Sequence, residues 1–320
     1  MQKMSSFKLK PLLIGLVVTL LIVACQNRTV RQPSDPQLAD CRTVQHVMGE
    51  VCVPKEPERL ISLDNSTFAD AFALGVPSIA VSSHSDLADY LVEKSGDVEF
   101  LGKSAAPSLE RMSQLNPDLI VGIELFTKST YPQLSQIAPT AVGKWIGNPS
   151  WQEHFDFVAR VLGKEKEAQA VWADYDRRIE ELKAALGDRA QDLEISLAYA
   201  CCGQISMDAT NSFVGSILAD LGIRQTEAQT VIGDGTIPLS EERLTDLDAD
   251  ILFMSIYDEE SEQILADWQK KPLWNQLQVV QNKQVYLVNA DVWRAGDPLA
   301  ANLVIDDLYK YLVEQSYSRF

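Results

Sequence analysis

Cysteines are the residues of this chain whose spacing most directly suggests chemistry. Cys201 and Cys202 are adjacent, so they can form a vicinal disulfide, remain two free thiols or bind a soft metal ion as a pair. Of these three states we favour the disulfide. Cys41 and Cys52 flank a segment with short extended pieces on either side of Gly49, and a disulfide between them would staple a hairpin. Closing so short a loop contributes roughly 3 kcal/mol to stability in the chain-entropy model.

The N-terminal segment predicts export and lipidation. Three lysines precede an uncharged run of thirteen residues, 12–24, which is the order of a secretory signal. The run is shorter than the roughly 20 apolar residues that a membrane-spanning helix needs. It ends in Leu-Ile-Val-Ala-Cys, which resembles the bacterial lipobox, so we expect Cys25 to be lipidated and to become the N-terminus. An ordinary signal peptide cleaved further on is the alternative. Disulfides persist in an exported protein, which favours the pairs Cys41 with Cys52 and Cys201 with Cys202.

Length and composition indicate a folded protein of about two domains. The chain has 320 residues, of which 46% are hydrophobic and 23% are charged, and these values are typical of globular domains. It carries 28 Lys and Arg against 45 Asp and Glu, a formal net charge of −17. Because so acidic a chain lacks the cations that neutralise phosphates, nucleic acids are excluded as general partners.

The sequence contains none of the common catalytic motifs. There is no Gly-x-Ser-x-Gly elbow, no His-Glu-x-x-His helix, no P-loop and no Gly-x-Gly-x-x-Gly after the first strand. We therefore predict that the protein is not an enzyme; an exported hydrolase that uses dispersed acids is the alternative. His46, His84 and His154 lie far apart, which disfavours a bare Zn²⁺ or Mn²⁺ site. The acidic run 258–262 lacks the spacing of a Ca²⁺ loop and is predicted to be a solvated surface loop.

Apolar strands alternate with amphipathic helices from residue 59 onward. Strands are predicted at 59–63, 78–81, 119–122, 193–199, 251–254 and 284–288. Helices are predicted at 68–74, 109–115, 131–137, 150–161, 164–186, 213–221, 240–247, 264–269 and 298–314. This repeated order implies an α/β fold, with mostly parallel strands covered by helices.

One long helix separates two similar halves. The predicted helix 164–186 has a single apolar stripe and a length of about 35 Å, which is enough to lie across two lobes. Segments 107–121 and 238–252, on either side of it, each contain a capped helix with Glu-Arg, then an Asp, then a buried strand. We therefore expect a signal peptide over 1–24, a lipid-anchored linker over 25–40, an N-terminal lobe with the disulfide hairpin over 41–149, connecting helices over 150–187 and a C-terminal lobe over 188–320.

Short phrases along nearly the whole mature chain resemble one family. They include Pro-Glu-Arg-Leu-Ile-Ser-Leu at 57–63, then 71–77, 109–111 with 116–120, 134–139, 272–274, 285–288 and 296–301. In this order they resemble the periplasmic substrate-binding proteins of iron-siderophore and cobalamin ABC importers. The hairpin at 41–52 looks most like cyanobacterial members related to the ferric dicitrate and ferric hydroxamate binders. The resemblance implies two Rossmann-like lobes joined by a single long helix, the helical-backbone metal-receptor type.

The resemblance also implies a ligand between the lobes, at the carboxyl ends of the strands. That ligand would be an iron(III) chelate, with no resident cofactor or metal; heme or cobalamin, with an axial ligand from the loop holding His84, is the alternative. Trp293 and Arg294 follow the last strand, where family members contact the siderophore, and Arg294 suits an anionic citrate or citrate-hydroxamate complex. Ser104 stands where ferric hydroxamate binders often have arginine, and Lys103 can substitute for it. The other expected lining residues are Phe126, Lys128, Trp145, Tyr199 and Tyr257.

Partners in the cell envelope follow from the same resemblance. In the family, one glutamate on each lobe docks onto arginines of the membrane permease, and the repeated segments place Glu110 and Glu242 at those positions. The alternative is that each acid only complements the dipole of a first helical turn. We expect a monomeric periplasmic lipoprotein, tethered to a membrane, that delivers a ferric siderophore to an ABC permease and its ATPase. A ligand sensor with the same cleft is a further alternative.

Overall fold

The computed structural model describes residues 41–83, 87–145, 151–230, 233 and 235–314. The chain divides into the units Met1–Asp40 and Cys41–Phe320, and all described residues belong to the second. The predictions for the signal peptide, the linker, Cys25 and His84 therefore lie outside the described residues, as does the boundary expected at 149–150. Within the described ranges, no helix combines the length and the apolar character needed to cross a bilayer.

An antiparallel hairpin begins the described chain. Strand β1 (Cys41–His46) pairs with β2 (Gly49–Pro54), and a disulfide joins Cys41 to Cys52, as the sequence led us to expect. The hairpin packs beside the last strand of the first sheet, where Val44 and Val53 enter the hydrophobic core.

The first sheet has five parallel strands in the order β5-β4-β3-β6-β7. They are β3 (Leu60–Ser62), β4 (Ser78–Ser83), β5 (Glu99–Lys103), β6 (Leu119–Ile123) and β7 (Thr140–Gly143). Its helices are α2 (Asn65–Ala73), α3 (Asp89–Ser95), α4 (Leu109–Gln114), α5 (Glu124–Thr127) and α6 (Tyr131–Ile137). Strands β3 and β6 are buried along their whole length, as expected of central strands covered on both faces. We call this sheet, its helices and the hairpin the N-terminal lobe.

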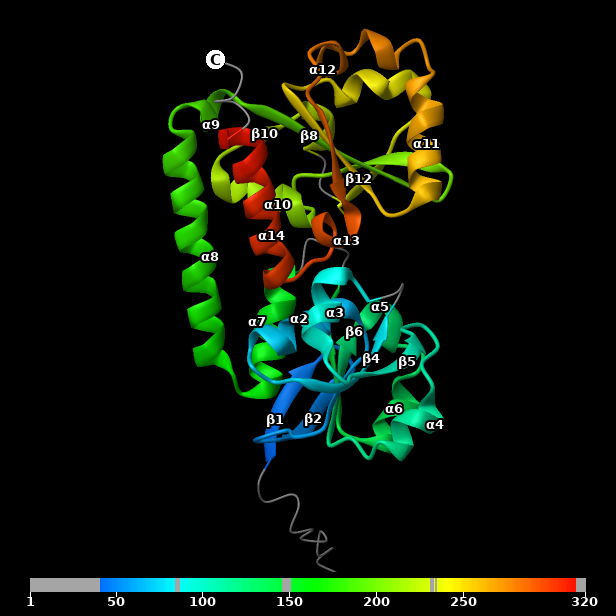
Figure 1. Ribbon diagram of the computed structural model, residues 1–320. Coiled ribbons are helices and arrows are strands. Elements are labelled where there is room, and N and C mark those ends of the chain that lie inside the picture. Colours follow the sequence, from blue (N-terminus) through cyan, green and yellow to red (C-terminus); the bar gives the residue numbers. More distant parts are fainter. Residues whose placement is uncertain (1–40, 84–86, 146–150, 231–232, 234, 315–320) are drawn as a thin grey trace, which may run out of the picture. The chain divides into compact units, whose positions relative to one another are not determined.

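The second sheet is mixed and forms the C-terminal lobe (Figure 1). Its strands are β8 (Glu194–Cys201), β9 (Gln204–Asp208), β10 (Arg224–Gln225), β11 (Thr236–Pro238), β12 (Ile251–Ile256) and β13 (Val285–Asn289). The order is β11-β9-β8-β12-β13, with β10 also beside β8; β9 and β11 run antiparallel to their neighbours, and the other pairs are parallel. Its helices and turns are α9 (Arg189–Asp192), α10 (Phe213–Leu221), η3 (Glu227–Gln229), η4 (Glu241–Leu247), α11 (Glu259–Gln269), η5 (Trp274–Gln276), α12 (Gln278–Gln281), α13 (Ala290–Trp293), α14 (Pro298–Tyr309) and η6 (Lys310–Glu314).

Helices α7 (Trp151–Leu162) and α8 (Glu165–Leu186) connect the two lobes. Helix α8 has 22 residues, about 33 Å at 1.5 Å per residue. Ala168, near its start, belongs to the core of the N-terminal lobe, whereas Tyr175 and Leu182 belong to the core of the C-terminal lobe. Trp172 lies between them and packs against both cores. The prediction of two lobes joined by one long helix is therefore confirmed.

Two aspartates hold equivalent strand pairs in the two lobes. Asp118 precedes β6, and its carboxylate accepts hydrogen bonds from the amides of Glu58 at 2.8 Å and Arg59 at 3.0 Å, just before the neighbouring β3. Asp250 precedes β12 and accepts a hydrogen bond of 2.9 Å from the amide of Glu194, the first residue of the neighbouring β8. The repeated phrases in the sequence thus mark the same structural unit in each lobe.

The structure differs from two local predictions. The helix predicted at 240–247 is present over Glu241–Leu247, but as the 3₁₀ helix η4. The acidic run 258–262 is not a loop: the carboxylate of Asp258 caps α11 by accepting a hydrogen bond of 2.9 Å from the amide of Ser261. Its three glutamates consequently occupy the first turn, where negative charge complements the helix dipole.

Candidate functional site

A cavity of about 380 Å³ lies where the carboxyl ends of the two sheets meet. The N-terminal lobe lines it with the segments and first helical turns that follow β3, β4, β6 and β7; the residues include Asp64, Ser66, Tyr90, Phe126 and Trp145. The C-terminal lobe lines it with the segments that follow β12 and β13, including part of α13; the residues include Tyr257, Asp291, Arg294 and Ala295. This is the place where α/β sheets bind ligands.

Arg294 is the one lysine or arginine among the described residues that line the cavity. Its side chain is 12% exposed, and its guanidinium carbon lies 3.4 Å from the centre of the Tyr199 ring. Nη2 of Arg294 lies 3.5 Å from Oδ1 of Asp208, so the two form an ion pair. Tyr199 comes from β8 and Asp208 from the end of β9. A stacked ring and a paired acid therefore hold a permanent cation at the cavity wall.

Part of the hydrogen-bonding capacity of Arg294 is unused. Its buried Nε has no hydrogen-bond partner among the described residues, and neither has Oδ1 of Asp208. Burial raises the pKa of Asp208, and the charge of Arg294 opposes this shift. A guanidinium with a free donor beside a cavity is suited to carboxylate or other anionic oxygens.

Aromatic side chains give the cavity apolar walls. Trp145 lies edge-on to His154, with the ring centres 5.4 Å apart. Gly296 has φ +80°, and a Cβ there would lie 3.0 Å from the Trp145 ring, so glycine lets the indole approach the loop after α13. Tyr257 is 41% exposed and reaches solvent. Together with Phe126, these rings suit the organic part of a large ligand.

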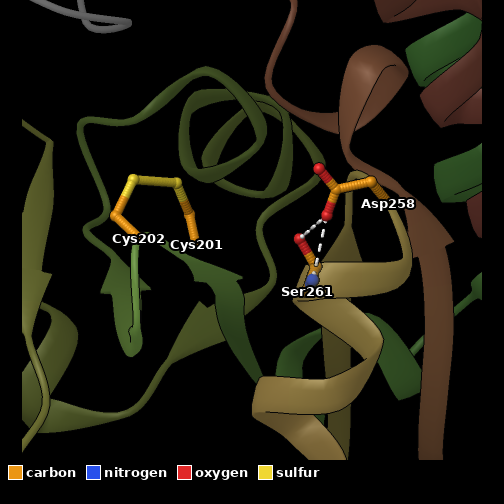
Figure 2. The surroundings of a disulfide bond; sticks show 4 residues. All are labelled: Cys201, Cys202, Asp258 and Ser261. Atoms are coloured by element: carbon orange, nitrogen blue, oxygen red, sulfur yellow. Dashed lines mark hydrogen bonds between the residues drawn. A yellow bond between two sulfur atoms is a disulfide. The ribbon is translucent and has the colours of Figure 1, made fainter.

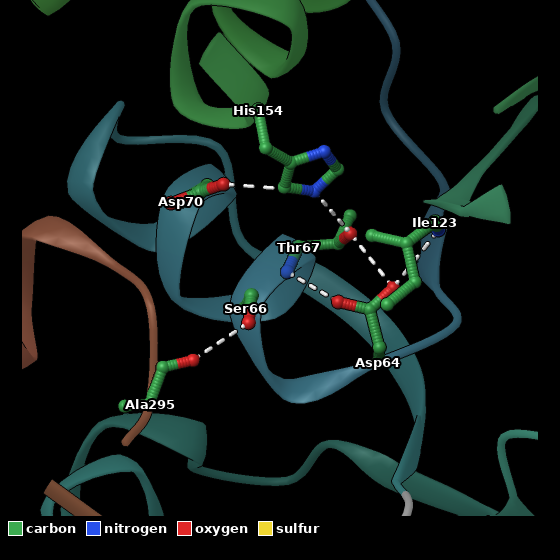
Figure 3. A network of polar contacts seen from close by, with 7 residues as sticks. All are labelled: Asp64, Ser66, Thr67, Asp70, Ile123, His154 and Ala295. Atoms are coloured by element: carbon green, nitrogen blue, oxygen red, sulfur yellow. Dashed lines mark hydrogen bonds and ion pairs between the residues drawn. The ribbon is translucent and has the colours of Figure 1, made fainter. Parts of the chain in front are cut away.

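The two lobes contact each other beside the cavity. Ser66 donates a hydrogen bond of 2.9 Å from its hydroxyl to the carbonyl oxygen of Ala295 (Figure 3). The Tyr90 hydroxyl donates one of 2.6 Å to the carboxylate of Asp297, which caps α14. Both contacts join residues of the N-terminal lobe to the segment after α13, so they fix the position of the loop that carries Arg294.

A buried polar network lies next to these contacts in the N-terminal lobe (Figure 3). Asp64 caps α2: its carboxylate accepts hydrogen bonds from the Thr67 amide at 2.8 Å, the Thr67 hydroxyl at 2.9 Å and the Ile123 amide at 3.2 Å. Because the Thr67 hydroxyl gives its hydrogen to Asp64, Nε2 of His154, 3.0 Å away, is the donor to that hydroxyl. Nε2 also lies 3.8 Å from Oδ2 of Asp70.

Burial determines the protonation of this network. Desolvation raises the pKa of Asp64 to about 6, and the hydrogen bonds from Thr67 oppose it. Desolvation lowers the pKa of His154 to about 3. Asp70 has no hydrogen-bond partner among the described residues, and desolvation, followed by the charges of Asp297 and Asp64, raises its pKa well above the usual value. A neutral imidazole beside a protonated Asp70 is the state that these shifts favour.

The structure brings five of the predicted site residues together. Phe126, Trp145, Tyr257 and Arg294 line the cavity, and Tyr199 supports Arg294 from β8. That these residues bind a ligand stays a prediction.

Trp293 does not line the cavity, which corrects the sequence-based expectation. Its side chain is 2% exposed and lies in the core of the C-terminal lobe, with its ring centre 4.6 Å from that of Phe253. Its Nε1 donates a hydrogen bond of 2.8 Å to the carboxylate of Asp307 in α14. Trp293 ends the short helix α13, so its indole packs inward while the next residue, Arg294, faces the cavity.

Lys103, Ser104 and Lys128 also lie away from the lining of the cavity. Lys103 is exposed at the end of β5, the edge strand of the first sheet, and Ser104 after it is 2% exposed. Lys128 is exposed and pairs with Glu124 one helical turn earlier, at 2.8 Å. Of the segment after β6, Phe126 lines the cavity and Lys128 does not.

Sequence reasoning missed several lining residues. Asp64 and Ser66 directly follow β3, so the rule that ligands bind after parallel strands would have found them. Asp291 and Ala295 flank the predicted pair at 293–294. Tyr90 lies in α3, seven residues after the end of β4, and no pattern in the sequence indicates that it lines the cavity.

The structure also gives the positions of the two glutamates predicted to dock onto a permease and of the adjacent cysteines. Glu110, in the first turn of α4, and Glu242, in η4, are both exposed, one on each lobe. Cys201 and Cys202 form a disulfide at the end of β8 (Figure 2). No group of three or more His, Cys, Asp or Glu side chains in the described ranges is placed to hold a metal ion.

The family described as periplasmic binding protein matches residues 60–292, from β3 to α13. This chain belongs to the periplasmic binding protein family. Members of this family are substrate-binding proteins. Family membership therefore confirms the prediction that the chain is not an enzyme.

Named relatives of this periplasmic binding protein extend over most of its length. The probable siderophore-binding lipoprotein YfiY of Bacillus subtilis is 30% identical over 318 residues, which cover 95% of this chain and 97% of that protein. The Fe(3+) dicitrate-binding periplasmic protein FecB of Escherichia coli is 30% identical over 285 residues, with coverages of 85% and 91%. Staphylococcus aureus SirA complexed with staphyloferrin B matches with a TM-score of 0.77 and 26% identity, with coverages of 85% and 98%.

Proposed function

We propose that this protein captures an anionic iron(III) chelate, of the ferric citrate or citrate-hydroxamate type, in the cavity between its lobes. Arg294 carries the proposal: it is a buried guanidinium that lines the cavity, and its Nε has no hydrogen-bond partner among the residues that the structure describes. Guanidinium groups bind carboxylates through charge-assisted and often bidentate hydrogen bonds. The iron is cargo inside the chelate, so the protein itself needs no resident cofactor.

The net charge of the chain does not oppose an anionic ligand. The field inside a cleft depends on the few charges that line it, whereas the total charge governs solubility. The lining also includes the acids Asp64 and Asp291. The carboxylate of Asp64 already accepts three hydrogen bonds from within the N-terminal lobe. Arg294 is the one lining lysine or arginine in the described ranges, and its Nε has no hydrogen-bond partner there, which supports an anionic ligand.

The names of the relatives support an iron chelate as the ligand. They include a siderophore-binding lipoprotein, a ferric dicitrate-binding protein and a protein solved with staphyloferrin B. Within this chemistry, the aromatic walls and Arg294, the one lining lysine or arginine of the described part of the chain, favour a chelate that presents carboxylates to Arg294.

Delivery completes the proposed function. A lipid on Cys25 would tether the protein in the cell envelope, where it acts as a monomer. The exposed Glu110 and Glu242, one on each lobe, would pair with arginines of an ABC permease that is driven by its ATPase.

Binding of a panel of chelates tests the proposal. The full chain in mild detergent would be titrated with ferric citrate, a ferric citrate-hydroxamate, a neutral ferric trihydroxamate, heme and cobalamin, following tryptophan fluorescence. Because Trp145 lines the cavity, an anionic ferric chelate should quench it saturably. Saturable binding of heme or cobalamin alone would replace the proposed ligand, and no binding by any compound would reject it.

A further inference from the structure

One β-hairpin supplies both groups that hold Arg294. Tyr199 lies in β8 beneath the guanidinium at 3.4 Å, and Asp208 lies at the end of β9, 3.5 Å from Nη2. The two strands pair antiparallel, with Tyr199 opposite Ser206 and Cys201 opposite Gln204. Tyr199 and Asp208 therefore share one face of the hairpin, because side chains two residues apart along a strand point the same way.

The turn of this hairpin consists of Cys202 and Gly203. Both have positive φ, 57° and 80°, which is the pattern of a two-residue type I′ turn. Glycine adopts this conformation without cost, but an L-residue such as Cys202 is uncommon there and costs of order 1 kcal/mol. The disulfide joins Cys202 to Cys201, the last residue of β8, and so restrains the turn at its least favourable position (Figure 2).

The turn also lies at the cavity edge of the sheet. The pairing of β8 with β12 ends at Ala200 and Ile256, so Cys201 and Tyr257 are the next residues in sequence. Tyr257 lines the cavity. Cys202 is exposed, so a small reductant can reach the disulfide.

We propose that the Cys201–Cys202 disulfide is a positioning element of the chelate site, which holds the β8–β9 turn so that Tyr199 and Asp208 fix Arg294. Affinity for anionic chelates then depends on the oxidation state of this pair. Reduction by a dithiol breaks the S–S bond: the dithiol supplies two electrons and two protons, the protein gains two thiols, and the dithiol becomes a disulfide. The inference rests on the proposed function, since the readout is binding of an anionic chelate.

The effect must be reciprocal. If reduction weakens chelate binding about tenfold, bound chelate must lower the midpoint potential of the disulfide by about 30 mV, because the two equilibria are linked. The ligand would thus protect the disulfide from reduction.

Four proteins test the inference: the full chain, Cys201→Ser/Cys202→Ser, Cys201→Ser/Cys202→Asn, and Cys41→Ser/Cys52→Ser. The serine pair removes the restraint and should weaken ferric citrate binding about tenfold, the equivalent of about 1.4 kcal/mol. The asparagine variant creates Asn-Gly, the preferred type I′ sequence, and should bind like the oxidised wild type. The Cys41 and Cys52 pair lies in the remote hairpin and should leave affinity unchanged.

Two further measurements separate positioning from general stability. Binding of a neutral ferric trihydroxamate should not change in the serine pair, because Arg294 attracts anions. In an Arg294→Gln background the serine substitutions should cause no further loss of affinity, since their effect acts through Arg294.

The outcomes distinguish the two proposals. If the oxidised wild type binds no anionic chelate, the proposed function fails. If it binds, but reduction and the serine pair leave affinity unchanged, the positioning role of the disulfide is rejected. Equal weakening in the serine and asparagine variants would also reject it, because the turn would then not be the cause.

Discussion

The Tyr90 hydroxyl donates a hydrogen bond of 2.6 Å to Oδ2 of Asp297, and this contact joins the two lobes beside the cavity. Asp297 is fully buried and also accepts hydrogen bonds from the amides of Leu299 and Ala300, both at 2.9 Å. One carboxylate thus caps α14 and anchors the other lobe. Arg294 directly precedes Ala295, whose carbonyl oxygen accepts the Ser66 hydrogen bond, so both contacts lie within three residues of Arg294.

Replacing Tyr90 by phenylalanine should lower the free energy of unfolding by about 1–3 kcal/mol, because a buried carboxylate loses a donor. Urea denaturation measures the change. Tyr309→Phe is the matched control: Tyr309 is 40% exposed, and its change should stay within about 0.5 kcal/mol. Equal losses for the two variants would show that the Tyr90 contact does not stabilise the fold.

His154 should make stability fall with acidification. Its pKa is about 3 in the folded protein and 6.5 as its ordinary value, so between these values the unfolded chain binds a proton that the folded protein excludes. Replacing His154 by glutamine should remove this dependence, which amounts to at most about 1.4 kcal/mol per pH unit. Urea denaturation at about pH 7.5, 6 and 5 compares the two proteins in this window.

Three buried aspartates near His154 have the opposite effect on the pH dependence of stability. Asp64 and Asp297 have pKa values raised to about 6 by burial, above the ordinary 3.8, so their contribution is full at low pH and is lost as pH rises through 6. Asp70, whose pKa is raised further, acts in the same sense. All three are present in both proteins, so the difference between wild type and His154→Gln reports the histidine. Parallel stability curves would mean that His154 titrates normally when folded.

Glu110 and Glu242 should matter for transport and not for binding. Their simultaneous replacement by alanine removes one exposed charge from each lobe without touching the cavity. Uptake of labelled ferric chelate by cells should be abolished while affinity stays unchanged. Exposed Glu56 and Glu260 serve as the control pair, and their replacement should leave uptake intact. Loss of affinity in the Glu110/Glu242 variant would show that their assignment is wrong.

Periodic patterns predicted the parallel elements well, since β3, β6, β8 and β12 are short apolar runs bounded by helices. Strands β9, β10 and β11 were missed because two to five residues show no clear period, and β11 contains Pro238. The sequence therefore did not predict the β8–β9 hairpin, and the ion pair between Asp208 and Arg294 was not predicted either. Its turn is formed by Cys202, the second residue of the vicinal pair, and Gly203.

Some site residues were also predicted correctly from the sequence and others were not. Arg294 was predicted because a resemblance placed it after the last strand, and the structure puts it at the cavity. Trp293 was predicted for the same reason, but sequence cannot say which of two adjacent side chains faces a core. Lys103 and Lys128 were predicted because they follow apolar runs. Only the sheet order shows that β5, which Lys103 ends, lies at an edge, and only the structure shows that Lys128 pairs with Glu124 on the surface. Tyr90 and Asp297 lie 207 residues apart, and pairing them requires the fold.

The most direct test of the account compares ferric citrate binding by wild type, Arg294→Gln and Lys128→Gln, using tryptophan fluorescence at constant ionic strength. Lys128 is the matched control, because it is an exposed cation paired with Glu124 and does not line the cavity. Removing a charged hydrogen-bond partner costs about 1.5–3 kcal/mol, so Arg294→Gln should weaken binding by about 10- to 100-fold. Lys128→Gln should bind like wild type. Equal affinity of wild type and Arg294→Gln would contradict the central claim that Arg294 selects an anionic iron chelate.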